Sequence, residues 1–222
     1  MNRDRLLRRI YDSLDAYFGD LHWWPGETPF EVIVGAILTQ STAWRNVETA
    51  IRRLKDRGIM DPRSFRLVPE RELASIIRPA GFFNVKAARL KAFVSFLHED
   101  YDGRLDRMFA VEMGPLREVL LTVKGIGPET ADSILLYAGG KPAFVIDAYM
   151  RRILSRHGII SPKADYLFIQ KLFVTNLPCE VPIYKQYHAL IVETGKVFCR
   201  NTPSCRDCPL GKRTFHPPQI PA

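Results

Sequence analysis

Apolar residues recur at helical spacing along almost the whole of this 222-residue chain. Leu6, Leu7, Ile10, Leu14 and Phe18, for example, fall on one side of a helix whose other side is charged. No stretch as long as a strand shows the strict alternation of apolar and polar residues that favours a sheet. The spacing therefore predicts an all-α fold.

Capping residues, prolines and short glycine-containing breaks mark the expected helix boundaries. Thr28-Pro29-Phe30-Glu31 has the pattern of a capping box with proline at the first helical position, which predicts a helix over residues 29–38. The spacing predicts further helices over residues 43–57, 69–77, 85–97, 115–123, 128–137, 148–157, 166–175 and 182–197. Residues 198–222 lack such a pattern and are expected to be irregular.

The charge balance points to a polyanionic partner. The chain has 32 Lys and Arg against 24 Asp and Glu, a formal net charge of +8, and its calculated pI is 9.5. The chain has no signal-peptide pattern at its start and no apolar run near the roughly 20 residues that span a bilayer. We therefore expect a cytoplasmic, nucleoid-associated protein without a membrane partner, whose four cysteines are reduced or metal-bound.

Residues 121–131 have the pattern of a helix end, a short turn and a new helix. Gly125 and Gly127 allow a tight turn and a close approach of backbone N–H groups to an anion. Pro128 favours the start of the next helix, whose N-terminus carries the positive end of the helix dipole. Such a hairpin fits a DNA phosphate without reading sequence, although an ordinary helix corner has the same pattern.

A second motif, Phe144-Val-Ile-Asp-Ala-Tyr-Met-Arg-Arg152, follows this hairpin by about twenty residues. Together the two motifs resemble the hairpin-Gly/Pro-Asp signature of the endonuclease III superfamily of helix-hairpin-helix DNA glycosylases. The segments Ala36-Ile-Leu-Thr-Gln-Ser-Thr42 and Gly81-Phe-Phe-Asn-Val-Lys-Ala87 extend the resemblance over nearly the whole chain.

The resemblance implies a two-lobed fold with DNA in the cleft between the lobes. One lobe would contain residues 25–135, with the hairpin at about 115–137. The other would contain residues 1–24 and 136–222, with a cysteine loop at 198–216. The implied partner is damaged double-stranded DNA, and relatives usually act as monomers.

Asp147 is the family's catalytic aspartate according to the resemblance. It would stabilise the developing oxocarbenium ion and help position the attacking water after a damaged base has flipped out. From its position alone, an aspartate after an apolar run is better explained as the cap of the next helix.

Glu129 occupies the position at which the bifunctional branch of the family carries a nucleophilic lysine. A carboxylate forms no Schiff base, so we predict hydrolysis without strong lyase activity. Lys124, just before the turn, keeps a weak lyase reaction open.

The base pocket is assigned to Trp23, Trp24, Pro25 and Trp44, which resemble the 3-methyladenine DNA glycosylase III branch. Tryptophan faces attract cations, which suits an alkylated purine. The alternative is that these tryptophans are ordinary core residues.

Family members insert side chains into the gap left by the flipped base. Gln40 and Phe82 occupy the positions of these inserted side chains according to the resemblance. The alternative is that Phe82 is a core aromatic residue beside Phe83. The resemblance implies further DNA contacts at Asn84, Lys86, Lys124, Gly125, Ile126, Gly127 and Thr130. A basic helix face such as the one with Lys86 suits phosphates but is often only solvated.

Cys199-x5-Cys205-x2-Cys208 resembles the loop that holds a [4Fe–4S] cluster in many relatives. The first gap is one residue short, and the fourth cysteine is replaced at about Thr214. His216 is a candidate fourth ligand for zinc or an unusual cluster, and a loop without metal is the third alternative.

The predicted function is the removal of damaged, 3-methyladenine-like bases by base flipping and hydrolysis without strand cleavage. A bifunctional glycosylase and AP lyase acting on oxidised pyrimidines through Lys124 is one alternative. A non-catalytic protein that uses the hairpin only to hold DNA is the other. The lesion, the opposite-base preference, the metal content and any protein partner stay open at this stage.

Overall fold

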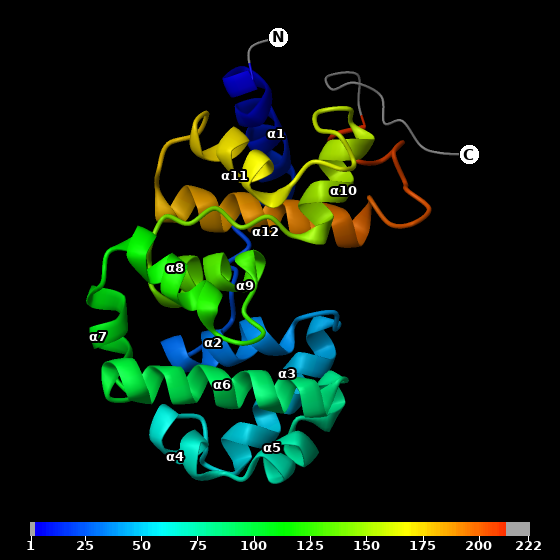
Figure 1. Cartoon of the computed structure of the whole chain (residues 1–222). Coiled ribbons are helices and arrows are strands. Elements are labelled where there is room, and N and C mark those ends of the chain that lie inside the picture. The colour runs from blue at the N-terminus through cyan, green and yellow to red at the C-terminus, as the bar shows by residue number, and fades with distance from the viewer. Residues whose placement is uncertain (1–2, 212–222) are drawn as a thin grey trace. The chain divides into compact units, whose positions relative to one another are not determined.

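A computed structural model describes residues 3–211, and every regular element in that range is a helix (Figure 1). The all-α prediction is therefore confirmed. No helix among the described residues is both long and apolar enough to cross a membrane.

The chain divides into two compact units. The first contains Met1–Trp23 and Pro142–Ala222, and the second contains Trp24–Lys141. Residues 136–141, which the sequence assigned to the lobe with both termini, fall in the second unit. The reason is local packing, because the π-helix that ends at Ala138 lies against the first helix of the second unit.

In the part of the first unit that the structure describes, the helices are α1 (Arg3–Phe18), α10 (Ala148–Arg156), α11 (Tyr166–Val174) and α12 (Val181–Val197). Helix α12 packs against both α1 and α10 (Figure 1). Its Tyr184 and Tyr187 are fully buried beside the stacked rings of Phe144 and Phe173, whose centroids are 4.3 Å apart. The Tyr187 hydroxyl donates a hydrogen bond to the Leu7 carbonyl oxygen, 3.1 Å away, which satisfies this buried polar group.

The second unit contains the helices from α2 to η2. They are α2 (Pro29–Leu38), α3 (Trp44–Asp56), α4 (Pro62–Leu67), α5 (Glu70–Ile76), η1 (Arg78–Ala80), α6 (Phe83–Tyr101), α7 (Leu105–Ala110), α8 (Met113–Thr122), α9 (Pro128–Ser133) and η2 (Ile134–Ala138). Helix α2 forms the centre of this unit, because every residue from Phe30 to Leu38 is buried. It packs against α3, α6, α9 and η2.

The start of α2 follows the predicted pattern. The Thr28 hydroxyl accepts a hydrogen bond from the Glu31 backbone N–H at 3.1 Å. The Glu31 carboxylate accepts from the Glu27 N–H at 3.2 Å and forms a 2.9 Å ion pair with Lys55 of α3. This ion pair gives the buried Glu31 carboxylate a partner, as a charge at 5% exposure requires.

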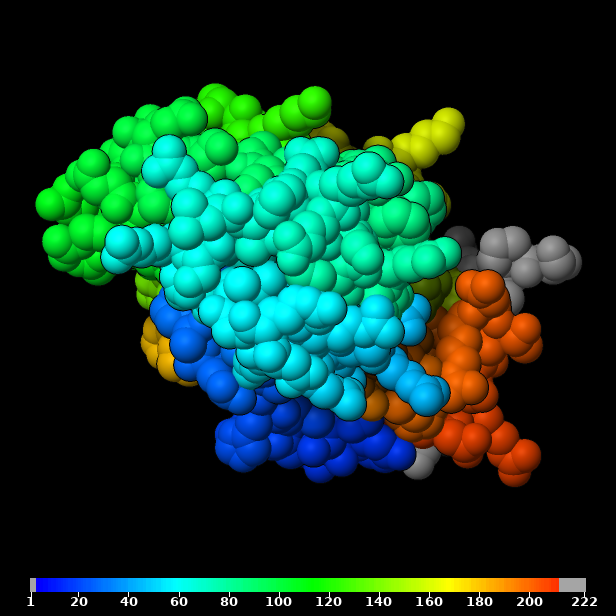
Figure 2. All heavy atoms as spheres, turned by 90° about the horizontal axis from the view of Figure 1, so that it is seen from below, coloured from blue at the N-terminus to red at the C-terminus, as the bar shows by residue number. Residues whose placement is uncertain are grey.

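The short helices α4, η1 and α7 were not predicted from the sequence, and the end of the helix predicted over residues 128–137 is a π-helix. Helices α4 and α7 have six residues each, too few to give a clear apolar period. The aspartate and proline at the start of α4 were the available signal, since Asp61 caps that helix and Pro62 begins it. Figure 2 looks onto the end of the second unit that α4 and α5 cover.

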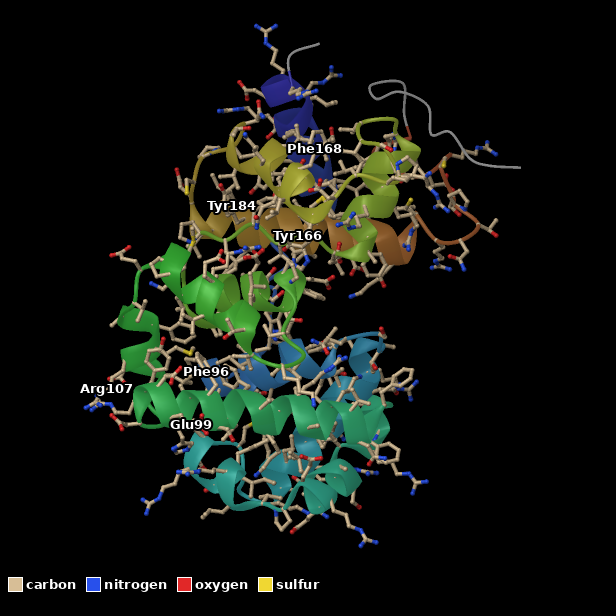
Figure 3. All side chains as sticks on the ribbon, viewed as in Figure 1. Phe96, Glu99, Arg107, Tyr166, Phe168 and Tyr184 are labelled. Atoms are coloured by element: carbon tan, nitrogen blue, oxygen red, sulfur yellow. The ribbon has the colours of Figure 1, made fainter. Side chains whose placement is uncertain are left out.

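The α6–α7 region shows how apolar and charged side chains separate in this unit. The Phe96 ring contacts Phe93 and Tyr101, with centroid distances of 6.1 and 5.5 Å. Arg107 projects outward from α7 and pairs with Asp102 (Figure 3). Exposed ion pairs of this kind contribute little to stability.

Candidate functional site

Asp147 lies at the N-terminus of α10 and caps that helix. Its backbone is extended, and its Oδ1 accepts a hydrogen bond from the Met150 N–H at 2.7 Å. The residue is 8% exposed. The capping role that its position suggested is therefore confirmed, and the hydrogen bond fixes the direction in which the carboxylate points.

The second carboxylate oxygen of Asp147 faces a histidine that the sequence analysis missed. Nε2 of His188 lies 3.7 Å from Oδ2 of Asp147, and His188 is 5% exposed on α12. A single histidine in an apolar helix gave no signal of this contact, because it depends on how α10 and α12 pack.

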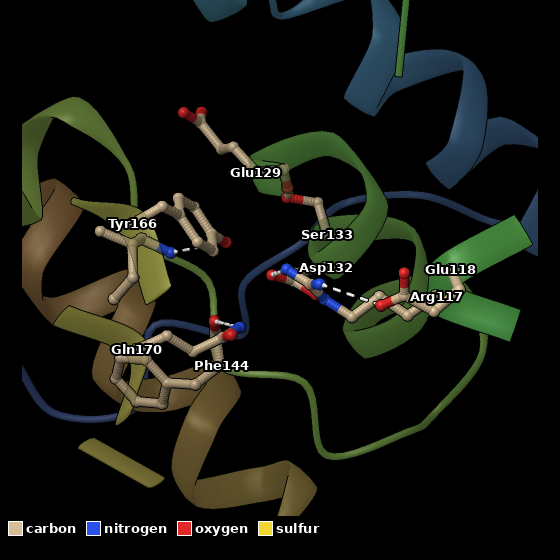
Figure 4. Close-up of polar contacts among 9 residues, drawn as sticks. Arg117, Glu118, Glu129, Asp132, Ser133, Phe144, Tyr166 and Gln170 are labelled. Atoms are coloured by element: carbon tan, nitrogen blue, oxygen red, sulfur yellow. Dashed lines mark hydrogen bonds and ion pairs between the residues drawn. The ribbon is translucent and has the colours of Figure 1, made fainter. Parts of the chain in front are cut away.

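The segment before Asp147 is held by α11. The Ile146 N–H donates to the Tyr166 hydroxyl oxygen at 3.3 Å, and the Gln170 amide donates to the Phe144 carbonyl oxygen at 2.8 Å (Figure 4). This extended stretch has no helix to satisfy its backbone groups, so these side chains supply the partners. They fix the backbone that delivers Asp147 to its cap position.

The predicted hairpin is formed by α8 and α9. Arg117 of α8 donates two hydrogen bonds to the fully buried Asp132 of α9, at 2.7 and 3.1 Å, and this bidentate pair ties the two helices together (Figure 4). In the turn between them, Gly125 has φ +88, a conformation that favours glycine. A Cβ at Gly125 would lie 2.2 Å from the Arg89 side chain, so glycine also allows this close approach.

Residues of the hairpin differ in what they expose. Lys124, Gly127 and Glu129 are exposed, whereas Ile126 and Thr130 are buried at 4% and 7%. The Ile126 N–H donates to the Val123 carbonyl oxygen at 3.0 Å, so this residue anchors the turn from inside. Its side chain is buried and its N–H is engaged within the turn, so the expected DNA contact of Ile126 stays a prediction that this geometry does not favour.

Gln40 is bound to the hairpin. Its amide nitrogen donates to the Gly125 carbonyl oxygen at 3.0 Å and to the Thr130 hydroxyl oxygen at 2.9 Å. Arg89 of α6 donates to the amide oxygen of Gln40. Gln40 thus connects the loop after α2 with the hairpin, and its polar atoms already have protein partners in this structure.

Lys86 is buried at 1% exposure, contrary to the expectation that it faces DNA phosphates. Its ammonium donates to the Leu38 and Ala80 carbonyl oxygens, at 2.7 and 2.8 Å, and to the Thr42 hydroxyl. Burial, together with the charge of Arg89, lowers the pKa of Lys86 from 10.5 to about 8. A phosphate cannot reach this ammonium without a rearrangement of the surrounding loops.

Phe82 and Asn84, by contrast, are exposed at the start of α6. Phe82 is 71% exposed, so it is not a core residue, and it has φ 44. A bulky residue with positive φ is uncommon and marks a local strain that the surrounding structure must hold.

An aromatic cluster in the second unit contains two of the predicted pocket residues. The Trp24 ring lies 5.4 Å from that of Trp44, nearly at a right angle, and 4.9 Å from that of Tyr137. Gly35 of α2 underlies both tryptophans, because a Cβ there would lie 3.4 Å from Trp24 and 3.6 Å from Trp44. Trp24 and Trp44 are only partly buried.

The sequence analysis missed Tyr137, which lies on the π-helix, because its place in this cluster depends on packing between elements far apart in the chain.

The other two predicted pocket residues flank this cluster in sequence. Trp23 belongs to the first unit, where the Lys196 ammonium lies 4.5 Å from its ring centroid. Pro25 is exposed. The ring of Trp23 therefore already has a cation against it, as an electron-rich indole face favours.

Three cysteines of the cysteine loop lie within the described residues. Cys199, Cys205 and Cys208 share a small apolar hollow, yet no group of three or more metal-ligating side chains in residues 3–211 is arranged to hold an ion. Arg156 donates to the Cys199 sulfur at 3.2 Å, and burial raises the pKa of Cys208. His216, the candidate fourth ligand, lies outside the described residues.

Comparison with known proteins gives one family. Residues 34–179 match the HhH-GPD superfamily of base excision DNA repair proteins. A Methanocaldococcus jannaschii protein, provisionally named a DNA repair glycosylase, is 47% identical over 211 residues, which are 94% of this chain and 96% of that protein. Endonuclease III of Bacillus subtilis is 27% identical over 82% of this chain and 78% of its own length.

Solved structures agree with the sequence comparison. Endonuclease III trapped covalently on DNA superposes with a TM-score of 0.81 and 25% identity, covering 95% of this chain and 94% of that one. The 3-methyladenine DNA glycosylase MagIII of Helicobacter pylori, bound to 1,N6-ethenoadenine, gives a TM-score of 0.76 and 27% identity. That match covers 88% of this chain and 98% of MagIII.

Proposed function

This chain belongs to the HhH-GPD superfamily of base excision DNA repair proteins and is a DNA N-glycosylase, and from that premise we propose that it removes alkylated purines by hydrolysis. The predicted superfamily is thereby confirmed. The proposed substrate is a damaged base in duplex DNA, and the protein acts on it as a monomer. The buried, cap-oriented carboxylate of Asp147 is the observation that carries the proposal.

Asp147 supplies the charge that the reaction needs. When the bond between C1′ and the base nitrogen breaks, positive charge develops on the sugar, and a fixed carboxylate stabilises that charge. Because one Asp147 oxygen is bound by the Met150 N–H, the group needs little reorganisation as the charge appears. The base leaves with the electron pair of the broken bond. Water then adds to C1′, and the proton that it loses passes to solvent.

The aromatic cluster of Trp24, Trp44 and Tyr137 supports an alkylated purine as the substrate. A purine methylated at N3 is cationic, so it leaves as a neutral base without an added proton. Electron-rich ring faces favour a flat cation over the neutral normal base. Trp44 is held in place by a 2.6 Å hydrogen bond from its indole N–H to Glu48. MagIII, which shares the fold, is named for 3-methyladenine.

Glu129 supports hydrolysis without lyase chemistry. It is exposed in the first turn of α9, at the position that would carry the nucleophilic amine of a lyase. A carboxylate forms no Schiff base with the sugar aldehyde. The exposed Lys124 is the amine nearest to it in sequence on the hairpin, and it defines the alternative outcome.

Phe82 acts as the wedge in this proposal. Its exposed ring fits the gap left by a flipped base, where it replaces the lost stacking. The hairpin turn, through Gly125 and Gly127, binds a DNA phosphate near the damaged base. This phosphate belongs to the damaged DNA strand or to the complementary one. Gln40 contacts DNA only if it exchanges its hydrogen bonds to the hairpin for bonds to a base.

Base release from duplexes that each contain one defined lesion tests the proposal. The panel contains 3-methyladenine, 1,N6-ethenoadenine, thymine glycol, uracil and 8-oxoguanine, and strand breaks are scored with and without alkali. We expect release of the alkylated purines with breaks only after alkali. Nicking at thymine glycol without alkali, together with borohydride trapping that Lys124→Gln abolishes, would favour the lyase alternative. Binding without any base release would favour a non-catalytic DNA-binding protein.

A further inference from the structure

Three non-glycine residues of the second unit have positive φ: Ser41, Phe82 and Asp102. Ser41, with φ 53, lies in the loop 39–43 after α2, and Phe82, with φ 44, ends the segment 78–82, which begins with η1. Left-handed backbone is unfavourable for a residue with a side chain, so it persists only where neighbouring groups hold it. Contacts with neighbouring groups must therefore hold these two segments in their strained conformations.

The buried Lys86 ammonium connects the two loops. It donates to the Leu38 carbonyl oxygen at the end of α2 and to the Ala80 carbonyl oxygen at the end of η1. It also donates to the Thr42 hydroxyl, which in turn donates to the Ala80 carbonyl oxygen at 2.7 Å. All three donor positions of the ammonium are therefore used, and every acceptor belongs to one of the loops or to the helix end that begins it.

We propose that Lys86 is the positioning residue of the wedge: by tying loop 39–43 to loop 78–82, it holds Phe82 in its strained, exposed conformation before DNA binds. This inference rests on the proposed role of Phe82 as the wedge. A preformed wedge inserts without first ordering its own loop, so less binding free energy is lost on insertion. A pKa of about 8 keeps Lys86 mostly protonated at pH 7, which the three donated hydrogen bonds need.

Lys91 offers a matched control on the same helix. Its ammonium donates to the Arg66 and Val68 carbonyl oxygens, at 2.7 and 2.8 Å, near the end of α4. It therefore makes the same kind of contact as Lys86, from α6 to carbonyl groups at a helix end, but the loops it holds contain neither Ser41 nor Phe82. Replacing either lysine with methionine keeps the apolar stem and removes the ammonium.

The test measures insertion directly. A duplex carries 2-aminopurine beside a stable abasic analogue, and stacking of the inserted wedge ring on that base lowers its fluorescence. We expect Phe82→Ala to abolish most of the decrease and Lys86→Met to lower the insertion constant about tenfold, as the loss of a hydrogen-bonded buried charge suggests. Lys91→Met should stay within about twofold of the wild type. Affinity for undamaged duplex should change little in any variant, since the phosphate contacts are intact.

A double-mutant cycle separates positioning from general destabilisation. If Lys86 acts through Phe82, Lys86→Met should have no further effect in a Phe82→Ala background, whereas independent effects would multiply. Multiplying effects, or a Lys86→Met variant that inserts like the wild type, would overturn the inference. If Phe82→Ala itself leaves the fluorescence unchanged, the wedge proposal fails instead, and the two failures are distinguishable.

Thr42→Val is a second variant in case Lys86→Met does not fold. It removes the hydroxyl that joins Lys86 to loop 39–43 and leaves the Leu38 and Ala80 contacts in place. We expect a two- to threefold lower insertion constant, in line with one weak hydrogen bond. An unchanged insertion constant in folded Thr42→Val would contradict a tie between the two loops.

Discussion

The two units of this protein contribute different kinds of functional group. The first unit holds a carboxylate, Asp147, whose direction is set by a backbone N–H and whose neighbour is a histidine. The second unit holds the hairpin turn, the aromatic cluster and the exposed Phe82. Under the proposed function, charge stabilisation belongs to the first unit and base recognition to the second, so substitutions in each should have separable kinetic effects.

Within the first unit, Asp165 provides an internal standard for Asp147. Both residues cap a helix, and Asp165 accepts from the Phe168 N–H at the same 2.7 Å distance. Asp165 is exposed, however, whereas Asp147 is buried beside His188. Cap geometry alone therefore does not mark a catalytic carboxylate.

The largest expected effect is that of Asp147→Asn. Asparagine caps a helix about as well as aspartate, so the melting temperature should hardly change. The single-turnover rate of base removal should fall about 10²–10³-fold, because the charge that stabilises the sugar is lost. DNA affinity should be retained. Asp165→Asn is the matched control at an exposed cap, and an equal loss of rate in that variant would show that the effect is not specific to the Asp147 carboxylate.

Glu129→Lys tests the role of the second unit, whose hairpin contains this residue. A lysine at this hairpin position supplies an amine that can form a Schiff base with the sugar. We expect a borohydride-trapped protein–DNA adduct that the wild type does not give. Glu129→Gln is the control without an amine. If the wild type is trapped as strongly as Glu129→Lys, another amine already serves, and monofunctional hydrolysis is excluded.

Trp44→Leu should affect recognition more than chemistry. Base–aromatic stacking contributes about 1–3 kcal/mol per base, so removal of an alkylated purine at subsaturating enzyme should fall about tenfold or more. At saturating enzyme the rate should recover most of this loss. Phe96→Leu, an aromatic replacement elsewhere in the second unit, is the control. A loss seen only in the rate at saturating enzyme would mean that Trp44 contributes to the chemical step and not to base recognition.

The two caps should contribute similarly to stability. Asp165→Ala should lower the free energy of unfolding by about 1 kcal/mol, the usual value of an N-cap, without loss of glycosylase activity. Asp147→Ala should lose a comparable amount of stability and the activity as well. Urea unfolding followed by circular dichroism measures both. A stability loss several times larger for Asp147→Ala would mean that its contact with His188 is structural.

A further expected effect is a pH dependence of stability from Lys86. Burial, with a contribution from Arg89, lowers its folded pKa to about 8, below the ordinary 10.5. From about pH 8 to 10.5 the unfolded chain therefore binds more protons than the folded one, and stability rises with pH. Urea unfolding at pH 7.5 and 9.5 should show the wild type gaining stability relative to Lys86→Met. If the wild type instead lost stability relative to Lys86→Met between pH 7.5 and 9.5, the predicted sign would be wrong.

The sequence predicted motifs well but not the partners of individual side chains. The capping box at Thr28 and the cap at Asp147 depend on residues within four positions of each other, so local pattern was sufficient. Lys86 looked like a DNA contact because a basic residue beside a motif suggests phosphates. Its burial depends on the ends of α2 and η1, and Leu38 is 48 residues away in the chain.

The sequence by itself determined the helical class, the hairpin and the aspartate after it, because helical period, glycine and proline act over a few residues. Only the tertiary structure decided that Lys86 is buried, that Gln40 binds the hairpin, that Tyr137 joins Trp24 and Trp44, and that His188 faces Asp147. These contacts join residues far apart in the chain, and their geometry is set by how helices pack, which no local pattern encodes.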